Sequence, residues 1–410
     1  MKLLKFNIHD LNFILTFAGF AIFTSITDTL SSVVYRAFAL IVAVLCIHVS
    51  GYRFRHLPMV LKLFLGLMVI VDLKTGFHLI SETTAYTDSR NLALLFIFGV
   101  TLVPVLAFAA GYCKIHWQRC LVVLEVLLVF TILMGYTSSL SIDDSVRMSL
   151  NARQSTLAFG DNSGYLFLLS ICLLNYSQSI VRRQWLWVWK IFLILALILS
   201  VLGMARAGSR GPVISALMGG LFILVTLRLK KQFNVSLIII AFVAVFGITT
   251  ATLERFAPVL YSRMSSTIDE GDMSGRDVLF AQAIQKISDN PISGDNPVIV
   301  LSDGFTSCHN GYLDVGVCLG IFGFIFYVSL SIWILISLIT HRSRIQTMPQ
   351  LFLSAMFFLS ATRAMTGANF VSNPNYALCI ACACVVVSQL KNEQSRQRIA
   401  IAQKVYQVKA

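Results

Sequence analysis

A histidine and a set of arginines lie in the polar stretches of an otherwise apolar chain, and their side chains are the ones best suited to chemistry. His309 and Asn310 end the longest polar interruption, directly before an apolar run. A neutral imidazole at a membrane-water boundary can accept a proton, and a guanidinium offers a planar set of donors that fits phosphate oxygens. Together these groups suit a reaction on an anionic, lipid-linked substrate.

Several arginines fall in stretches that the charge pattern places on the side of the membrane where basic residues are normally rare. They are Arg147, Arg153, Arg206, Arg210, Arg255, Arg263 and Arg276. Acidic residues in the same stretches offer each single arginine an ion pair as an alternative. These are Asp143, Asp144, Asp161, Asp269, Glu270 and Asp272. For the whole set of arginines, binding of an anionic ligand is the more economical explanation.

Two of these arginines precede predicted helices. Pro212 suits a first helical turn and Gly211 lets the backbone approach a ligand closely, so Arg210 would lie beside a helix N-terminus, a favourable site for phosphate. Arg276 opens the segment 277–288, whose apolar spacing predicts a short amphipathic helix that could lie along the membrane surface. The alternatives are a tight turn with an interfacial arginine and a capped surface helix with a solvated one.

The residues around His309 form a third candidate constellation. A lone histidine near an interface can be purely structural. Gly320 and Gly323, inside the apolar run that follows, are by themselves most simply a site of close helix packing. Cys379 and Cys382 lack nearby histidine or acidic partners, so we interpret them as packing residues rather than a metal or redox site.

Membrane-spanning helices must position all of these residues. Of the 410 residues, 57% are hydrophobic and 12% are charged, and the mean hydropathy is +0.79, which excludes an ordinary soluble domain. Apolar runs long enough to cross about 30 Å of hydrocarbon recur along the chain, and we predict about twelve spans. They lie near residues 9–27, 33–50, 57–73, 91–112, 117–138, 163–180, 185–204, 212–229, 234–252, 311–339, 349–367 and 374–390.

The net charge of +13 does not indicate nucleic-acid binding, because the basic residues form short clusters on alternate loops. The clusters are Lys2 and Lys5, Arg53 and Arg55, Lys114 and Arg119, Arg182 and Arg183, Arg228 with Lys230 and Lys231, Arg342 and Arg344, and the tail from Lys391 to Lys409. They predict a cytoplasmic side that holds both termini. The first apolar run has no small-residue cleavage site and is followed at once by another span, so we expect it to be retained rather than cleaved. The long polar stretches 74–90, 139–162 and 253–310 then face the periplasm.

We find no linker or repeat and therefore predict one membrane domain over residues 1–410, all-α, with part of the active site in the periplasmic loop 253–310. No acidic pair or histidine cluster suits a divalent metal, so we expect no metal and no other cofactor. The expected partners are membrane lipids and the lipid-linked substrate.

Taken in order, three motifs resemble those of the O-antigen ligase and O-antigen polymerase superfamily. The motifs are Ser209-Arg210-Gly211, Gly275-Arg276 followed by Asn290-Pro291-Ile292-Ser293-Gly294, and His309-Asn310 followed by Gly320-x-x-Gly323. The span layout and the large loop between the ninth and tenth spans are also similar, so the resemblance covers most of the chain. Each motif is weak singly, but their ordered combination is fairly specific for the superfamily.

The resemblance implies a metal-independent glycosyltransferase of the GT-C type in the bacterial inner membrane. Such an enzyme joins a glycan from undecaprenyl diphosphate to an acceptor sugar hydroxyl, which in the ligases belongs to lipid A-core. Arg210, Arg276 and His309 match the family's catalytic positions. We expect Arg147, Arg153 and Arg206 to help hold the diphosphate, and Asn310, Tyr312 and Asp314 to lie on the acceptor side.

Two alternatives remain open. Phe324 stands where many ligases have Thr, and Gly311-Tyr312-Leu313-Asp314 is similar to some exopolysaccharide polymerases, which would use the same donor. A transporter or lipid flippase would concentrate its polar residues near the bilayer midplane. Glu125 is the best candidate for such a buried carboxylate, but the predicted spans are otherwise largely free of charge.

Overall fold

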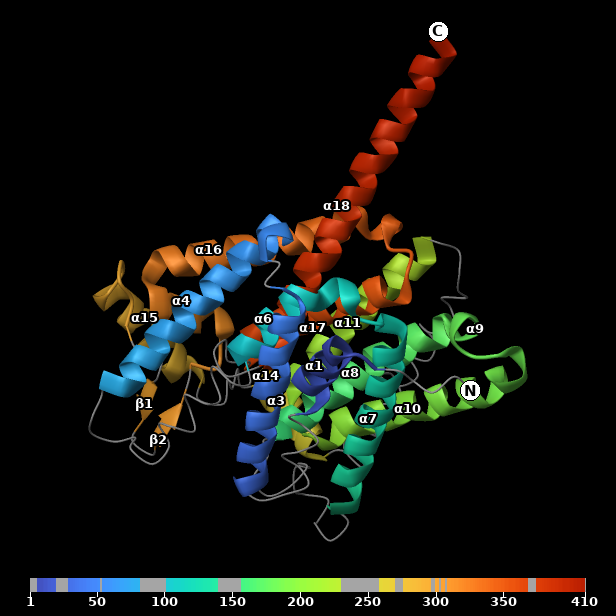
Figure 1. Cartoon of the computed structure of the whole chain (residues 1–410). Coiled ribbons are helices and arrows are strands. Elements are labelled where there is room, and N and C mark those ends of the chain that lie inside the picture. The colour runs from blue at the N-terminus through green and yellow to red at the C-terminus, as the bar shows by residue number, and fades with distance from the viewer. Residues whose placement is uncertain are drawn as a thin grey trace.

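The structure is a computed structural model. It describes residues 6–19, 29–51, 54–81, 101–138, 156–229, 258–269, 276–295, 299–301, 304–306, 308–367 and 374–409. Within these residues the regular structure is helical, as predicted, apart from one antiparallel pair of short strands (Figure 1). The strands are β1 (Ile299–Leu301) and β2 (Gly304–Thr306).

Helices account for almost all predicted spans that fall on described residues. The N-terminal half contains α1 (Ile8–Ile14) with η1 (Leu15–Gly19), α3 (Thr29–Val49), η2 (Phe54–His56), α4 (Met59–Ser81), α6 (Val103–Gly111), η4 (Tyr112–Lys114), α7 (Trp117–Ser138), α8 (Thr156–Asn175) and α9 (Ser177–Ile180). The C-terminal half contains η5 (Arg183–Trp185), α10 (Leu186–Arg206), α11 (Arg210–Leu229), α14 (Pro258–Asp269), α15 (Arg276–Asp289), α16 (Gly311–His341), η6 (Arg342–Arg344), α17 (Met348–Thr366) and α18 (Pro374–Lys409). The predicted span 234–252 lies outside the described residues.

Four helical segments of the described residues are long and apolar enough to cross a membrane, namely Trp117–Tyr136, Arg183–Arg206, Arg210–Arg228 and Gly311–Arg344. Together with the composition, they are typical of a multi-pass membrane protein. Two predicted boundaries were wrong. The stretch from residue 74 was expected to be a polar loop, but α4 continues to Ser81, and α8 begins at Thr156, so that Asp161 lies in a helix.

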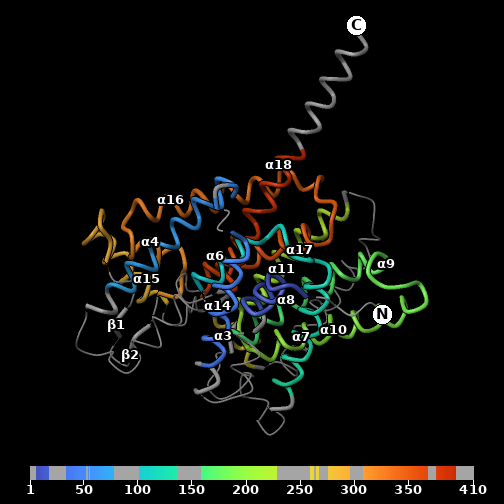
Figure 2. The backbone as a smooth tube through the Cα atoms, viewed as in Figure 1, coloured from blue at the N-terminus to red at the C-terminus, as the bar shows by residue number. Residues whose placement is uncertain are grey.

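The centre of the molecule is built on α8, which packs against α7, α10, α11 and α17 (Figure 2). Small residues allow this close approach. A Cβ atom on Gly164 would lie 3.5 Å from that of Ala216 in α11, and one on Gly160 would lie 2.8 Å from Cγ of Pro212. Small residues spaced four apart allow two helix backbones to approach closely. The packing brings the N-terminal turns of α8 and α11 together.

The long helix α16 is broken at Gly320, whose φ of 71° is left-handed. Our interpretation of this glycine as a helix-packing residue was wrong. Instead, the turn after α15 contacts the break, and the backbone nitrogen of Ile321 donates to the carbonyl of Pro291 over 2.8 Å. A Cβ atom on Gly320 would lie 2.3 Å from that carbonyl oxygen, so no larger residue fits here without a shift.

The same contact is reinforced from α4, which runs beside α16 (Figure 1). The ammonium group of Lys74 donates to the carbonyl of Cys318 over 2.6 Å and also to the carbonyl of Ser293. A helix break leaves backbone carbonyls without helical partners, and Lys74 satisfies one of them. The amphipathic helix α15 is thereby fixed to α16 at its C-terminal end.

Candidate active site

His309 lies at the entrance to α16 in a conformation that few residues adopt. Its φ is 53°, and it is the only non-glycine residue with positive φ in the described part of the chain. Asn310 caps the helix, because its side-chain oxygen accepts from the backbone nitrogens of Tyr312 and Leu313 at 3.0 and 3.2 Å. On the other side, the buried thiol of Cys308 donates to Asp314 over 2.9 Å. The chain is therefore held on both sides of the histidine.

The imidazole of His309 forms a hydrogen bond with the backbone of Gly367, the residue that ends α17. Gly367 has a φ of 143°, and its backbone nitrogen donates to the carbonyl of Arg363. Without a side chain at Gly367, two guanidinium groups come close to it. Nη1 of Arg363 lies 3.2 Å and Nη2 of Arg276 lies 3.5 Å from the position that a Cβ atom would occupy. One imidazole and two guanidinium groups thus converge on one glycine.

Arg363 is buried and forms an ion pair with Asp161 of α8. Its Nε lies 2.5 Å from one carboxylate oxygen, its Nη2 lies 3.1 Å from the other, and its Nη1 donates to Thr366 over 3.1 Å. A bidentate pair of this kind has a fixed geometry as well as a charge. It ties the last turn of α17 to the first turns of α8.

Arg276 reaches the site from the first residue of α15. One face of this helix is buried, with Leu279 and Ala283 packed against Val317 and Cys308. The predicted amphipathic helix over 277–288 is therefore present, and its buried face is directed towards α16. Because this packing and the contact at Gly320 both hold α15, the position of Arg276 is set by α16.

The surroundings of His309 favour its neutral form. Partial burial lowers the pKa of the imidazole from its usual range, and the nearby charges of Arg276 and Arg363 lower it further. The hydrogen bond to the Gly367 backbone opposes this shift, but the net direction is downward. A neutral imidazole at neutral pH is the form that can accept a proton.

Arg206 ends α10 and Arg210 begins α11, on either side of the short turn that joins these helices. Arg210 begins α11, and the next residue, Gly211, faces Arg363: a Cβ atom there would lie 2.6 Å from Nη1 of Arg363. The N-terminus of α11 therefore reaches the same site as Arg276 and His309. Arg147 and Arg153, predicted to contact the diphosphate, lie outside the described residues, as does Arg255.

The residues predicted on the acceptor side have structural contacts in the first turn of α16. Asn310 is the helix cap. The ring of Tyr312 packs 5.2 Å from that of Tyr327, and Asp314 is buried against the Cys308 thiol. Their contact with an acceptor stays a prediction.

Sequence reasoning missed Arg363 and its partner. Arg363 was not among the predicted site residues, and Asp161 was placed in the polar stretch 139–162. A signal was available, because a buried arginine inside an apolar run needs a counter-charge. The sequence offered several acidic candidates for that role, and only the packing of α8 beside α17 identifies Asp161.

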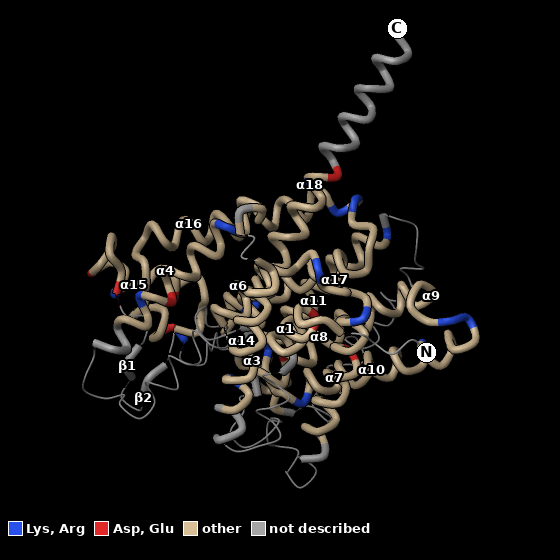
Figure 3. Tube along the Cα trace, viewed as in Figure 1, with Lys and Arg blue, Asp and Glu red and all other residues tan. Residues whose placement is uncertain are grey.

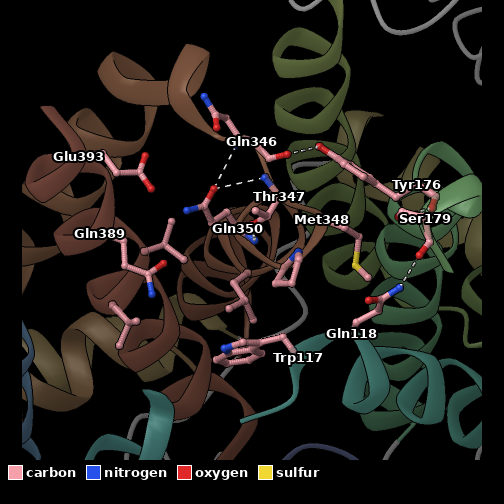
Figure 4. A pocket seen from close by; sticks show the side chains of 14 residues that line it. Trp117, Gln118, Tyr176, Ser179, Gln346, Thr347, Met348, Gln350, Gln389 and Glu393 are labelled. Carbon is pink, nitrogen blue, oxygen red and sulfur yellow. Dashed lines mark hydrogen bonds between the residues drawn. The ribbon is translucent and has the colours of Figure 1, made fainter. Parts of the chain in front are cut away.

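A separate cavity of about 700 Å³ lies at the opposite ends of the helices (Figure 4). It is lined by the beginnings of α7 and α17 and by the middle of α18, whereas His309 lies near the end of α17. Its polar groups bond to one another: Gln118 donates to the Ser179 carbonyl, and Tyr176 donates to that of Gln346. The cavity is therefore not part of the candidate active site.

Charged residues are sparse along the trace (Figure 3). Arg342 and Arg344 follow α16, while His309 precedes it; Arg182 and Arg183 follow α8, while Asp161 lies near its beginning. These two basic clusters thus lie at the helix ends opposite the site.

The match to a known family falls on the segment that contains most of this site. Residues 195–328 match the family model described as O-antigen ligase, which confirms the predicted resemblance to the superfamily. The matched segment includes Arg206, Arg210, Arg276 and His309 but neither Asp161 nor Arg363. No curated protein matches the chain.

Proposed function

We propose, from the match of residues 195–328 to the O-antigen ligase family model, that the protein transfers a glycan from undecaprenyl diphosphate to an acceptor sugar hydroxyl. The acceptor we propose is lipid A-core, which makes the protein an O-antigen ligase of lipopolysaccharide biosynthesis. The observation that carries the proposal is the convergence of Arg276, Arg363 and His309 on Gly367.

The reaction needs a base for the acceptor and a positive environment for the leaving group. In our mechanism the acceptor oxygen attacks the anomeric carbon of the glycan and its proton passes to the neutral imidazole of His309. The bond from that carbon to the diphosphate breaks, and the electron pair leaves with the diphosphate. Arg210 and Arg276 hold the diphosphate oxygens, helped by Arg206 and by Arg147 and Arg153 of the polar stretch 139–162.

Arginine takes the role that a divalent metal has in many enzymes that use activated sugars. A guanidinium stays charged at all relevant pH values and can bind two phosphate oxygens at once. The transfer we propose is therefore metal-independent and of the GT-C type. We place the acceptor beside the first turn of α16, next to Asn310, with Tyr312 and Asp314 supporting that turn.

We further propose that the protein lies in the bacterial inner membrane with both termini in the cytoplasm and the site facing the periplasm. This orientation is supported by the basic clusters at the helix ends opposite His309. It would give the site access to a lipid-linked donor in the outer leaflet.

The test is glycan transfer by the purified full-length protein in detergent, with an undecaprenyl diphosphate-linked glycan and lipid A-core as substrates. Loss of one preorganised charge donor typically costs about 10² to 10³ in rate, and we expect losses of this order for Arg210→Ala, Arg276→Ala and His309→Ala. Arg228→Ala removes an exposed arginine from the other end of α11 and serves as the matched control. Near-normal transfer by His309→Ala would remove the histidine from the role of base.

A polymerase is the second candidate, favoured by the Gly311-Tyr312-Leu313-Asp314 segment. Both enzymes need the same hold on the donor and differ in the acceptor. A deletion strain distinguishes them through its lipopolysaccharide: bare core with accumulated lipid-linked polymer indicates a ligase, and core with a single repeat indicates a polymerase. Any glycan transfer in detergent, without separate compartments, excludes a protein that only transports.

A further inference from the structure

The ion pair between Asp161 and Arg363 joins three helices where the site is formed. Arg363 lies in the last turn of α17, Asp161 lies near the beginning of α8, and Gly211 in the first turn of α11 faces the same guanidinium at close range. The side chain of Arg363 is 4% exposed and that of Asp161 is 17% exposed. The pair is therefore an internal feature of the site.

Three of the five N–H donors of Arg363 are directed at protein groups. Nε and Nη2 both bind the carboxylate of Asp161, and Nη1 donates to the hydroxyl of Thr366. A guanidinium held in this way is poorly placed to rearrange around a diphosphate. Arg276, which enters from a separate helix, is the better candidate for direct contact with the donor.

Arg363 is connected to His309 through one turn of backbone. The carbonyl of Arg363 accepts from the nitrogen of Gly367, and the backbone of Gly367 in turn bonds to the imidazole. Fixing Arg363 against α8 therefore also fixes the backbone of Gly367, whose hydrogen bond orients the imidazole of His309. The chain of contacts runs from Asp161 through Arg363 and Gly367 to His309.

We propose that Arg363, held by Asp161, is a positioning residue of this site that orients His309 through Gly367 and supplies a permanent positive charge beside the imidazole. The proposal deepens the proposed function and rests on it for the role of the histidine. Arg363 acts through its neighbours and is not itself a catalytic residue.

The charge of Arg363 also bears on the protonation of His309. The charged groups that act on the imidazole are Arg276 from α15 and Arg363 from α17, while Asp314 of α16 is bonded to the Cys308 thiol. Both guanidinium groups disfavour a second positive charge, so each lowers the pKa of His309. Replacing Arg363 by a neutral residue should raise that pKa, whereas lysine should preserve the charge.

The experiment uses the full-length protein in detergent with two readouts. The first is the rate at which diethyl pyrocarbonate modifies His309, followed by peptide mass spectrometry between about pH 5 and 8, since only a neutral imidazole reacts. The second is kcat and KM for glycan transfer. The first readout does not depend on turnover, so it tests the inference even if the proposed reaction is wrong.

We expect Arg363→Gln to move the midpoint of His309 modification to higher pH. Arg363→Lys should leave that midpoint near its original value and lower kcat by about 10²-fold, because lysine cannot form the bidentate pair and a small misplacement of the base is costly. Asp161→Asn should lower kcat in the same way, with less effect on KM and no upward shift of the midpoint. Arg228→Gln, at the far end of α11, should change neither readout.

Two results would overturn the inference. One is an unchanged midpoint in well-folded Arg363→Gln, and the other is wild-type kcat in Arg363→Lys or Asp161→Asn. If Arg363→Gln does not purify as a monodisperse protein, the kcat values of the other two variants decide the question. Absence of transfer by the unaltered protein, combined with a shifted midpoint in Arg363→Gln, would reject the proposed function and leave the contact between Arg363 and His309 standing.

Discussion

The backbone nitrogen of Ile321 donates a hydrogen bond of 2.8 Å to the carbonyl of Pro291, at the point where Gly320 interrupts α16. This bond joins the turn after α15 to a helix that is long and apolar enough to cross a membrane. Asp295 adds a second backbone bond, from its nitrogen to the carbonyl of Val317, over 2.6 Å. The helix that presents Arg276 is thus attached to a rigid element rather than to a loop alone.

Gly320→Ala tests this attachment. A Cβ atom would lie 2.3 Å from the Pro291 carbonyl, and a left-handed conformation is unfavourable for alanine, so we expect destabilisation of about 1 to 3 kcal/mol. The thermal denaturation midpoint in detergent should fall, and proteolysis near α15 should become faster. Gly66→Ala in α4, where a Cβ atom meets nothing within 4 Å, is the control. Equal thermal midpoints for the two variants would contradict the attachment.

Lys74→Met tests the support that α4 gives to the same contact. The substitution removes the bonds to the carbonyls of Cys318 and Ser293, and a hydrogen bond to a charged group is worth about 1.5 to 3 kcal/mol. We expect lower thermal stability and a smaller loss of glycan transfer than for His309→Ala. Lys190→Met removes an exposed lysine from α10 and should leave both quantities unchanged. If Lys190→Met behaves like Lys74→Met, the effect comes from the loss of a positive charge and not from the loss of these two bonds.

His309→Asn separates the backbone role of His309 from its chemistry. Asparagine tolerates the positive φ of 53° better than most residues, so the variant should retain normal thermal stability. Its rate of glycan transfer should fall by about 10²-fold or more. The thermal denaturation midpoint and size-exclusion chromatography check the folding of the variant, and the rate of glycan transfer checks its loss of activity. An inactive variant that also aggregates would indicate that the imidazole is needed for folding.

The activity of the unaltered protein should persist to a lower pH than an ordinary histidine would allow. The usual pKa of histidine is 6.5, and that of His309 is lowered by burial and by Arg276 and Arg363. The neutral form is the base, so activity is present above the folded-state pKa and is lost as pH falls through it. The acid limb of kcat/KM, which reports the substrate-free enzyme, should therefore lie below pH 6.5 and should move upward in Arg276→Gln. If the acid limb of the pH profile of the unaltered protein lay above pH 6.5, His309 would be rejected as the group whose titration controls activity.

Removal of divalent metal should leave turnover unchanged. No group of three or more His, Cys, Asp or Glu side chains in the described residues is arranged to hold a metal ion, and arginines take that role in our mechanism. Transfer rates measured with and without EDTA should agree. A clear loss that Mg²⁺ or Mn²⁺ restores would contradict the role given to Arg210 and Arg276.

The sequence was sufficient to predict those parts of the site that are encoded locally. Gly275 and Arg276 before an amphipathic segment predicted α15, and the apolar run after Asn310 predicted α16. The partnership of Asp161 with Arg363 could not be predicted, because it joins residues 202 positions apart. Spacing within one helix carries no information about which distant helix packs beside it.

The break of α16 at Gly320 could not be predicted from the sequence for a different reason. A Gly-x-x-Gly pair in an apolar run is common where two helices approach closely, and nothing in the run itself distinguishes that use from a break. The distinguishing fact is the position of Pro291, which follows α15 and reaches the break through space. Only the packing of α15 on α16 reveals it.

The pair between Asp161 and Arg363 also constrains how the protein is made. Asp161 is synthesised 202 residues before Arg363, so its carboxylate lacks this arginine while the intervening helices are made. Because an unpaired charge is costly inside lipid, we expect the site to be completed late in biogenesis, when α17 becomes available to pair with α8.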